Sequence, residues 1–409
     1  MGIPRSSGEL VRQASTPLIH RLLTQRLGSA IGLDNIPRTG PLVVIANHSS
    51  YLDHFAMLTL LHALRPGEVW FPTKSESFEK FASRAWHESM NCYPVDRSTP
   101  GEQVFDIAQR ILAQDNILVL YPEGTRGDGE TLLPFKTGAF RMAIDAGAPV
   151  VPVGTCGLAS ILPKGVHVPQ PGLYSLSVGP VMEVPDHGET RDKAREMRDD
   201  AVDQIIALRE QACDNNGLAA PWQIDAIVEL AQRIIAENMS QNGDVTSAVV
   251  GRLQLLLGLA DAMASRHPGL DLQRNRVRGF RALQSSGPGR MIRAAIVNRE
   301  ATRASAVYRY SDFAAYLAGR TSLLLPRFLG GGSQQAAGQF EQAAERGGVM
   351  TSQAYVGLAE SRLADDDQPG AVDAYHLALD SIPDDDPRGS LRRARIDQAL
   401  TELGDRTRP

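Results

Sequence analysis

In the first half of the chain, hydrophobic and polar positions follow two patterns that alternate along the sequence. Short apolar runs rich in valine, isoleucine and leucine are typical of buried strands, whereas the longer stretches between them carry apolar residues at helical spacing. The predicted strands cover residues 41–46, 69–71, 117–121, 149–154 and 173–179, and the predicted helices cover residues 78–90, 101–115, 137–147 and about 189–213. This alternation predicts an α/β domain with a mixed, largely parallel sheet flanked by helices.

An amphipathic helix is predicted over residues 9 to about 31, within an N-terminal segment of residues 1–35. Apolar residues recur every four positions from Ile19 to Ile31, and the arginines lie off this stripe. Such a helix either packs on its own domain or lies in a membrane interface with its basic residues at headgroup level. The pattern leaves both alternatives open.

The second half of the chain shows helical spacing only, starting after residue 219. This pattern predicts an all-α helical domain, with a helical region over residues 219–330 and helical hairpins over residues 331–409. Residues 352–385 form one 34-residue unit of two helices that resembles a tetratricopeptide repeat. Because about three such repeats are usually needed for a stable fold, we expect the hairpins to pack on the preceding helices or on a protein partner.

Composition and charge narrow the classes of protein. The chain has 409 residues, is 43% hydrophobic and carries a net charge of −5, which fits two or three globular domains and gives no general argument for nucleic-acid binding. Residues 274–309 are an exception, with nine arginines and one acidic residue. This stretch is either a solvated helical face or a patch for an anionic partner. Because aromatic residues do not alternate with the arginines, we favour anionic lipid over nucleic acid.

Cysteines and apolar runs bear on the compartment. The three cysteines, Cys92, Cys156 and Cys213, are far apart and odd in number, so we expect no disulfide framework and a reducing compartment. The first residues lack the apolar run of a signal peptide, and the longest apolar stretches fall short of the roughly 20 residues that a membrane span needs. We therefore expect a cytoplasmic protein.

The first motif with candidate chemistry is NHSSYLD, which places His48 and Asp53 five positions apart. On a continuous helix the two side chains would point about 140° apart, so they meet only if a turn presents His48 and the helix begins near residue 50. A carboxylate on one ring nitrogen would then orient the imidazole as a general base for a hydroxyl. The alternatives are a capping aspartate beside an incidental histidine, and a metal site with His54. The metal site is disfavoured because no third ligand lies at a familiar spacing.

The second motif, YPEGTRG, directly follows a predicted strand and forms a tight polar turn. Its residues of interest are Glu123, Gly124, Thr125 and Arg126. Glycine lets the backbone approach a ligand closely, and the guanidinium of Arg126 can bind phosphate or carboxylate oxygens through two N–H groups. The alternative is a structural salt bridge within the turn. Lys136, at the start of the next predicted helix, lies where amide donors already favour an anion.

Two further cations, Lys74 and Arg97, follow short extended runs, and residues 150–157, VVPVGTCG, are expected to form an apolar pocket wall. Together the motifs supply one base, one orienting carboxylate and four cations, a set that suits transfer to the hydroxyl of a phosphate-bearing acceptor. The sequence contains no G-x-S-x-G elbow, P-loop or G-x-G-x-x-G motif, which disfavours a serine hydrolase and a nucleoside triphosphatase.

The order of these motifs resembles the four sequence blocks of the glycerolipid acyltransferase family, of the lysophosphatidic-acid type. NHSSYLD, YPVDRS, YPEGTR with FKTGAFR, and VVPVG occur in the family's order and spacing over about residues 36–185, within a predicted domain of residues 36–215. The resemblance implies an α/β enzyme that moves a fatty acyl group from coenzyme A or acyl carrier protein to a glycerol-phosphate hydroxyl. The attack would be direct, with no acyl-enzyme, no metal and no cofactor beyond the acyl donor.

The resemblance also implies roles for individual residues. His48 would be the base and Asp53 its partner. The remaining substrate-binding residues would be Lys74, Arg97, Glu123, Gly124, Thr125, Arg126 and Lys136. Arg97, Arg126 and Lys136 would hold the acceptor phosphate. Two departures bear on the acceptor: the third block reads TRGDGE, where a serine usually follows the arginine, and residues 91–93 are bulkier than the usual small pair.

We therefore expect a cytoplasmic O-acyltransferase of phospholipid biosynthesis, bound peripherally to the inner face of a bacterial cell membrane. Its partners would be the membrane surface, a lysophospholipid acceptor, acyl-CoA or acyl carrier protein, and a protein bound by the C-terminal helices, with no nucleic acid. Two alternatives remain open. One is an acyltransferase for a specialised non-glycerol acceptor, and the other is a scaffold whose helical repeats bind peptides or partner helices.

Overall fold

The computed structural model describes residues 9–96, 102–163, 165–166, 168–240, 243–264, 266–287, 289–386 and 388–404. The chain divides into two compact units. The first consists of residues 1–238 and 251–267, and the second of residues 239–250 and 268–409.

The first unit is built on one seven-stranded sheet with the order β1-β7-β6-β2-β5-β3-β4. Its strands are β1 (Leu27–Ile31), β2 (Leu42–Ala46), β3 (Val69–Lys74), β4 (Cys92–Val95), β5 (Ile117–Leu120), β6 (Val150–Cys156) and β7 (Tyr174–Val178). Neighbouring strands are parallel except for β6 and β7, which are antiparallel. The predicted mixed, largely parallel sheet is confirmed. Because β6, β2, β5, β3 and β4 run the same way, their carboxyl ends share one edge of the sheet.

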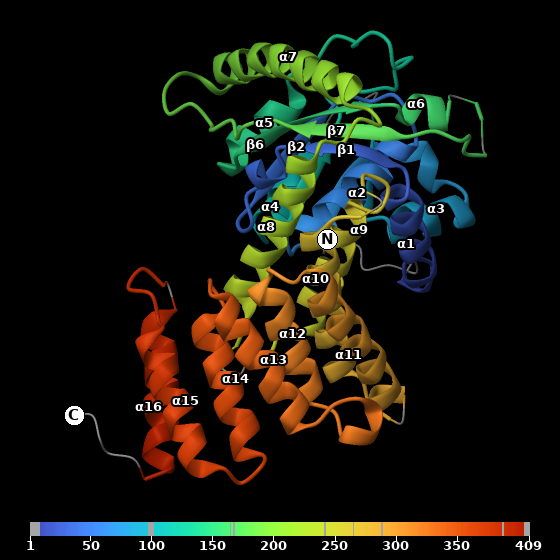
Figure 1. Ribbon diagram of the computed structural model, residues 1–409. Helices are drawn as coiled ribbons and strands as arrows, with labels where there is room; N and C mark the ends of the chain where they lie inside the picture. The colour runs from blue at the N-terminus through green and yellow to red at the C-terminus, as the bar shows by residue number, and fades with distance from the viewer. Residues whose placement is uncertain are drawn as a thin grey trace. The chain divides into compact units, whose positions relative to one another are not determined.

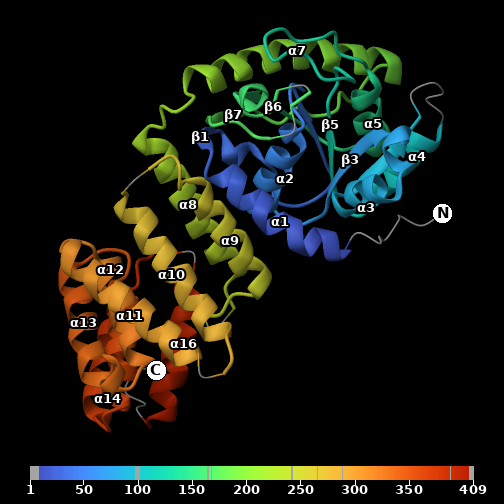
Figure 2. The same cartoon turned by 90° about the vertical axis from the view of Figure 1, so that its right-hand side faces the viewer.

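Helices flank the sheet on both faces. The helices are α1 (Glu9–Thr24), α2 (Leu52–Leu64), α3 (Phe81–Ser89), α4 (Glu102–Leu112), α5 (Gly138–Ala146), α6 (Leu158–Ile161), α7 (Thr190–Asp214), α8 (Pro221–Asn238) and most of α9 (Ser247–Leu259). Short 3-10 helices cover Leu33–Asn35 and Ser75–Phe78. In Figures 1 and 2, α7 crosses one face of the sheet and α2 covers the other. Every residue of β2 is buried, which is typical of a parallel strand covered by helices on both sides.

One large core lies between the sheet and the α4, α5 and α7 layer. It joins Val43 and Ile45 of β2 to Phe140 of α5 and to Met197 and Ile205 of α7. Apolar residues of α7 recur at helical spacing on the side that faces the sheet, while most of its charged residues are exposed. This packing holds the long helix against the strands whose carboxyl ends carry the polar motifs.

The N-terminal helix is shorter than predicted. It ends at Thr24, and Leu27–Ile31 forms β1, which pairs in parallel with β7. The prediction of one helix to about residue 31 was wrong because the four-residue apolar repeat also fits a strand that pairs with a distant partner. A side chain at Gly28 would place its Cβ 2.6 Å from the backbone nitrogen of Gly217, a close approach that a sequence pattern does not show.

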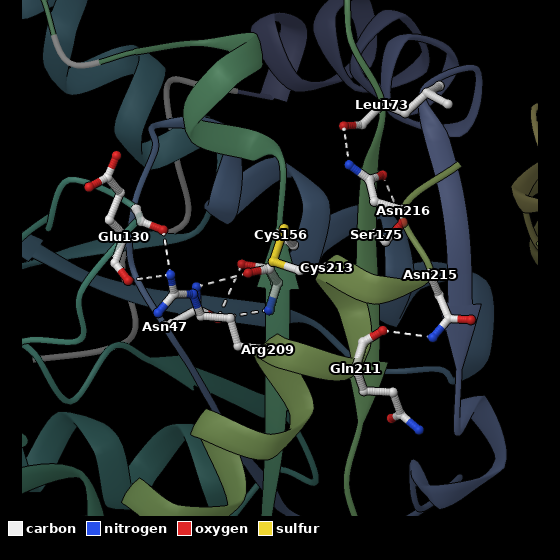
Figure 3. The surroundings of a disulfide bond; sticks show 12 residues. Asn47, Glu130, Cys156, Leu173, Ser175, Arg209, Gln211, Cys213, Asn215 and Asn216 are labelled. Carbon is white, nitrogen blue, oxygen red and sulfur yellow. Dashed lines mark hydrogen bonds between the residues drawn. A yellow bond between two sulfur atoms is a disulfide. The ribbon is translucent and has the colours of Figure 1, made fainter. Parts of the chain in front are cut away.

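A disulfide joins Cys156, the last residue of β6, to Cys213 in the last turn of α7, with the Cα atoms 5.2 Å apart (Figure 3). The structure contradicts the expectation of no disulfide framework at this pair, because a separation of 57 residues along the chain conceals the meeting of the two elements. Cys92 is buried in β4 and is not in a disulfide.

The second unit is helical throughout its described residues, which confirms the predicted all-α domain. Its helices are α10 (Pro268–Gln284), α11 (Gly289–Val307), α12 (Asp312–Leu323), α13 (Ser333–Arg346), α14 (Thr351–Leu363), α15 (Gln368–Asp380) and α16 (Gly389–Glu402), with a 3-10 turn at Arg327–Leu329. Each helix packs chiefly on the next. Phe340 is fully buried, and Cβ atoms built at Gly319 and Gly357 would lie 2.7 and 2.5 Å from its ring, so these glycines make room for it. The likeness to tetratricopeptide repeats and the division near residue 330 stay predictions.

None of the helices within the described residues is long and apolar enough to cross a membrane.

Candidate active site

The turn between β2 and α2 brings His48 and Asp53 together. The His48 Nδ1 and Asp53 Oδ2 atoms lie 2.8 Å apart, and Asp53 is fully buried in the first turn of α2. The same Oδ2 atom accepts hydrogen bonds from the backbone N–H groups of Ser49 and Ser50, at 2.6 and 2.9 Å. Asp53 therefore combines the two predicted roles. It caps the free N–H groups at the start of α2, and it also holds the imidazole of His48.

This contact sets the orientation of the imidazole. With Nδ1 bonded to a carboxylate, the neutral ring carries its proton on Nδ1 and presents the lone pair of Nε2. The His48 side chain keeps 12% of its surface exposed, so the ring is reachable although its partner is not. This geometry is the one that a general base requires.

Aromatic rings form the wall beside the base. The Tyr121 ring stacks on His48 with the centroids 4.2 Å apart, and the His54 ring lies 5.5 Å from His48. Burial, with the nearby His48 as a smaller cause, lowers the pKa of His54 to about 3, so His54 is neutral near pH 7. Burial also raises the pKa of the Tyr121 phenol well above its usual value. The wall next to His48 is thus uncharged.

Glu123 ties the second motif to the backbone of the first. Its Oε1 atom accepts the backbone N–H of His48 at 2.6 Å, and Oε2 accepts the N–H of Leu133 at 2.9 Å. The backbone N–H of Gly127 donates to the His48 carbonyl at 2.8 Å. Burial raises the pKa of Glu123, against these hydrogen bonds, which favour the carboxylate. The side chain acts on the shape of the site, because both oxygens bind backbone rather than facing solvent.

Two of the predicted cations converge on the same turn. The Arg126 guanidinium carbon lies 3.5 Å from the centre of the Tyr51 ring, and its Nη1 atom is buried with no hydrogen-bond partner within the described residues. The Lys136 side chain passes over Gly124, where an added Cβ would lie 3.0 Å from Nζ, and the φ of Gly124 is +71°. Gly124 therefore provides both the turn conformation and the space for the lysine.

The remaining predicted site residues are Thr125, Lys74 and Arg97. Thr125 is exposed on the turn, and Lys74 is exposed at the carboxyl end of β3, on the same edge of the sheet. Arg97 lies outside the described residues. Among the described residues, no group of three or more His, Cys, Asp or Glu side chains is arranged to hold a metal ion.

Sequence reasoning missed residues that hold the site together. The Asn47 side chain accepts the N–H of Thr155 at 2.7 Å and donates to its carbonyl at 3.0 Å, which fixes the residue before His48 to β6. Ser50 donates its hydroxyl to the Leu162 carbonyl at 2.9 Å. Both lie inside the NHSSYLD motif, so their position beside His48 was the available signal. Their partners lie more than 100 residues away.

Comparisons with known proteins agree with the motifs. Residues 29–155 match the family described as Acyltransferase. The chain is 29% identical over 190 residues to human 1-acyl-sn-glycerol-3-phosphate acyltransferase alpha, which covers 46% of this chain and 65% of the relative. It is 26% identical over 182 residues to the 1-acyl-sn-glycerol-3-phosphate acyltransferase of Bacillus subtilis, covering 44% of this chain and 87% of that relative.

A crystal structure of the 1-acyl-sn-glycerophosphate acyltransferase PlsC from Thermotoga maritima has a TM-score of 0.36 and 22% identity, covering 48% of this chain and 82% of that one. The chain spans less than two thirds of the length of the first curated relatives that it matches. The matched region contains the His48 turn, the Glu123 turn and the β6 strand in the family's order. The α/β part of this chain is therefore similar, over these motifs and in their order, to 1-acyl-sn-glycerol-3-phosphate acyltransferases.

Proposed function

We propose that this protein is an O-acyltransferase that moves a fatty acyl group from acyl-CoA or acyl carrier protein to the hydroxyl of a lysophospholipid, with a 1-acylglycerol-3-phosphate-like acceptor. The observation that carries the proposal is the 2.8 Å contact between His48 and the buried Asp53, with Arg126 and Lys136 on the adjoining turn. A base next to two cations suits a hydroxyl whose molecule also bears a phosphate.

The reaction follows from the orientation of His48. Nε2 takes the proton of the acceptor hydroxyl while its oxygen attacks the thioester carbonyl, and Asp53 stabilises the imidazolium that forms. When the tetrahedral intermediate collapses, the carbon–sulfur bond breaks and the thiolate takes the proton back from His48. The acyl group passes directly to the acceptor, so no covalent acyl-enzyme forms.

The acceptor phosphate is assigned to Arg126 and Lys136. The buried Nη1 of Arg126, which has no hydrogen-bond partner among the described residues, supports this, because an unsatisfied buried donor costs about 1–3 kcal/mol and a phosphate oxygen would satisfy it. Stacking on Tyr51 holds the guanidinium plane and leaves its N–H edge for the anion.

A test of this assignment measures transfer from a labelled acyl-CoA to matched acceptors with and without a phosphate. Arg126→Ala should raise KM for the phosphate-bearing acceptor by about 10-fold or more, the loss of a charge-assisted hydrogen-bond pair, and should affect a phosphate-free acceptor much less. Equal loss with both acceptors would contradict the assignment. Preferred transfer to a non-glycerol acceptor would favour the specialised acyltransferase.

The acyl donor is assigned to a second, basic cavity. A cavity of about 580 Å³ lies between the start of α5 and the N-terminal part of α7, a volume typical of small-molecule sites. It is lined by Thr137, Arg141, Thr190, Arg191, Ala194, Arg195 and Arg198. Four arginines suit the phosphates of coenzyme A. Arg195→Gln should raise KM for acyl-CoA and leave acceptor KM unchanged, and an unchanged donor KM would contradict this placement.

Peripheral membrane binding on the inner face is supported by exposed apolar residues beside arginines. Leu10 and Leu18 of α1 are 80% and 69% exposed, and Ile292 of α11 is 65% exposed between Arg290 and Arg293. Such faces suit an anionic bilayer surface. Sedimentation with anionic vesicles should fall for Leu18→Glu, and wild-type protein that stays unbound would contradict the proposal.

A further inference from the structure

The C-terminal half of α7 packs directly on the strand that borders the active site. Gly154 of β6 faces the helix backbone so closely that an added Cβ would lie 2.3 Å from the nitrogen of Arg209 and 2.4 Å from the carbonyl carbon of Leu208. Arg209 and Cys213 are four residues apart and therefore share one face of the helix. Figure 3 shows that this face looks toward β6 and toward the loop that contains Glu130.

The first connection from this face runs through the disulfide. Cys213 is bonded to Cys156, and the preceding residue, Thr155, is held by Asn47 (Figure 3). The Asn47 side chain accepts the N–H of Thr155 at 2.7 Å and its hydroxyl at 3.2 Å, and donates to its carbonyl at 3.0 Å. Asn47 directly precedes His48. The disulfide thus anchors the neighbour of Thr155, and Thr155 is hydrogen-bonded to Asn47 at the start of the His48 turn.

The second connection runs through Arg209. Its guanidinium donates to the carbonyl of Gly129 at 2.7 Å and to the carbonyl of Glu130. The same loop is stiffened by Asp128, whose carboxylate accepts the N–H groups of Glu130 and Thr131, at 2.9 and 3.0 Å. Its other end is Gly127, whose N–H donates to the His48 carbonyl at 2.8 Å. Arg209 therefore fixes the loop that joins Arg126 to the backbone of His48.

We propose that Arg209 is a positioning residue for the His48 turn, and that the Cys156–Cys213 disulfide makes this positioning depend on redox state. The two connections start from one helix face and end on Asn47 and on the His48 carbonyl, the two groups that flank the imidazole along the backbone. This arrangement, the α7 clamp, consists of Arg209, Cys213, Cys156, Thr155 and Asn47. The kinetic part of the proposal rests on the proposed acyltransferase function.

Reduction opens only the covalent part of the α7 clamp. A dithiol attacks one sulfur, and thiol–disulfide exchange leaves two protein thiols and an oxidised dithiol, with two electrons and two protons transferred. The helix end is then held by hydrogen bonds and packing alone. Because a displacement of about 1 Å at a catalytic group can cost on the order of 100-fold in rate, partial loosening is enough to be measured. Burial raises the pKa of the Cys92 thiol to about 12, so this third cysteine does not compete in the exchange.

The kinetic test compares oxidised and dithiothreitol-reduced wild-type protein, with the disulfide state read by mass after alkylation. Reduction should lower kcat about 10-fold and raise acceptor KM, while KM for acyl-CoA stays unchanged. The double variant Cys156→Ser/Cys213→Ser should show the reduced values with or without dithiothreitol. Identical kinetics in both redox states would overturn the proposal, as would alkylation of Cys156 and Cys213 without reduction.

Arg209 is tested separately in the oxidised protein. Arg209→Gln should lower kcat and raise acceptor KM, and Arg209→Lys should recover part of the loss because it keeps a donor. The matched control is Arg233→Gln, an arginine of α8 in an exposed ion pair with Asp34. A merely structural role would lower the unfolding temperature of Arg209→Gln without this kinetic change, and that result would overturn the positioning role.

One readout does not depend on turnover. Hydrogen–deuterium exchange should quicken in residues 47–50 and 127–131 when the wild-type disulfide is reduced or Arg209 is replaced by glutamine. Unchanged exchange there would overturn the α7 clamp even if the enzyme is active. Faster exchange in a protein that transfers no acyl group to any acceptor would support the α7 clamp and reject the proposed function.

Discussion

Different kinds of contact stabilise the interior of each of the two units. In the α/β unit, the active-site turns are fixed by hydrogen bonds between residues far apart in the chain, such as Asn47 and Thr155, which are 108 positions apart. In the helical unit, each helix packs chiefly on its neighbour in the sequence, and buried alanines and glycines surround a few aromatic side chains. The long-range hydrogen bonds position the candidate site residues, whereas the packing between neighbouring helices stabilises a stack of helices. Substitutions in the two units should therefore separate activity from stability.

The largest effect on activity apart from the base itself is expected at Asp53. Asp53→Asn removes the charge that orients His48 and stabilises the imidazolium, so kcat should fall about 10²–10⁴-fold. The amide also loses the charged acceptor of the Ser49 and Ser50 N–H groups, so the unfolding temperature should drop modestly. Activity and thermal unfolding measured on the same preparation check this, and a kcat within a few-fold of wild type would contradict the partnership.

The opposite behaviour is expected in the helical unit at Phe340. Phe340→Ala removes a fully buried ring packed against two glycines, which should cost about 3–5 kcal/mol in the free energy of unfolding of that unit. Denaturant titration followed by far-UV circular dichroism measures the cost. Because the proposed base and cations lie in the other unit, kcat of the folded variant should stay near the wild-type value. A 100-fold loss of kcat would contradict the expected separation of activity from stability between the two units.

A smaller effect is expected at the glycine of the second motif. Gly124→Ala introduces a Cβ 3.0 Å from Lys136 Nζ at a φ of +71°, which strains the turn and displaces the lysine. Acceptor KM should rise about 10-fold, corresponding to the loss of one ion contact, and donor KM should not change. The matched control is Gly147→Ala at the end of α5, which also has positive φ but nothing within 4 Å of the added Cβ.

The smallest effect concerns pH and two half-buried histidines, His20 of α1 and His62 of α2. Burial lowers the pKa values of His20 and His62 to about 4, whereas unfolded histidines bind protons below about pH 6.5. Between these values the unfolded state binds more protons, so stability is full above pH 6.5 and is lost as pH falls toward 4. His62→Leu should remove on the order of 1–2 kcal/mol of this pH dependence. Denaturation at pH 7 and pH 4.5 measures it, and an equal pH dependence in both proteins would contradict it.

The sequence predicted most elements for which the spacing of apolar residues fits only one kind of secondary structure. The runs at 41–46 and 117–121 became β2 and β5, and the helical spacing after residue 219 became a helical unit. Residues 27–31 were assigned to a helix because a four-residue repeat is compatible with either element, and only pairing with β7 decides for a strand. Local periodicity is informative where neighbours in the chain also pack together.

The site was predictable in part for the same reason. His48, Asp53 and the Glu123 turn lie in compact motifs whose spacing points to a strand–turn–helix connection. The disulfide, the Asn47–Thr155 bonds and Arg209 depend on how α7 crosses β6, which no local pattern encodes. Arg97 lies outside the described residues and stays a prediction.

The proposed function depends most on His48 as the general base of an acyl transfer. Its most direct test measures transfer of a labelled acyl group from acyl-CoA to 1-acylglycerol 3-phosphate by wild-type protein and by His48→Ala, with thermal unfolding confirming that both are folded. We expect product with the wild type and a loss of about 10²–10⁴-fold in the variant. Turnover by folded His48→Ala within a few-fold of the wild type would contradict it.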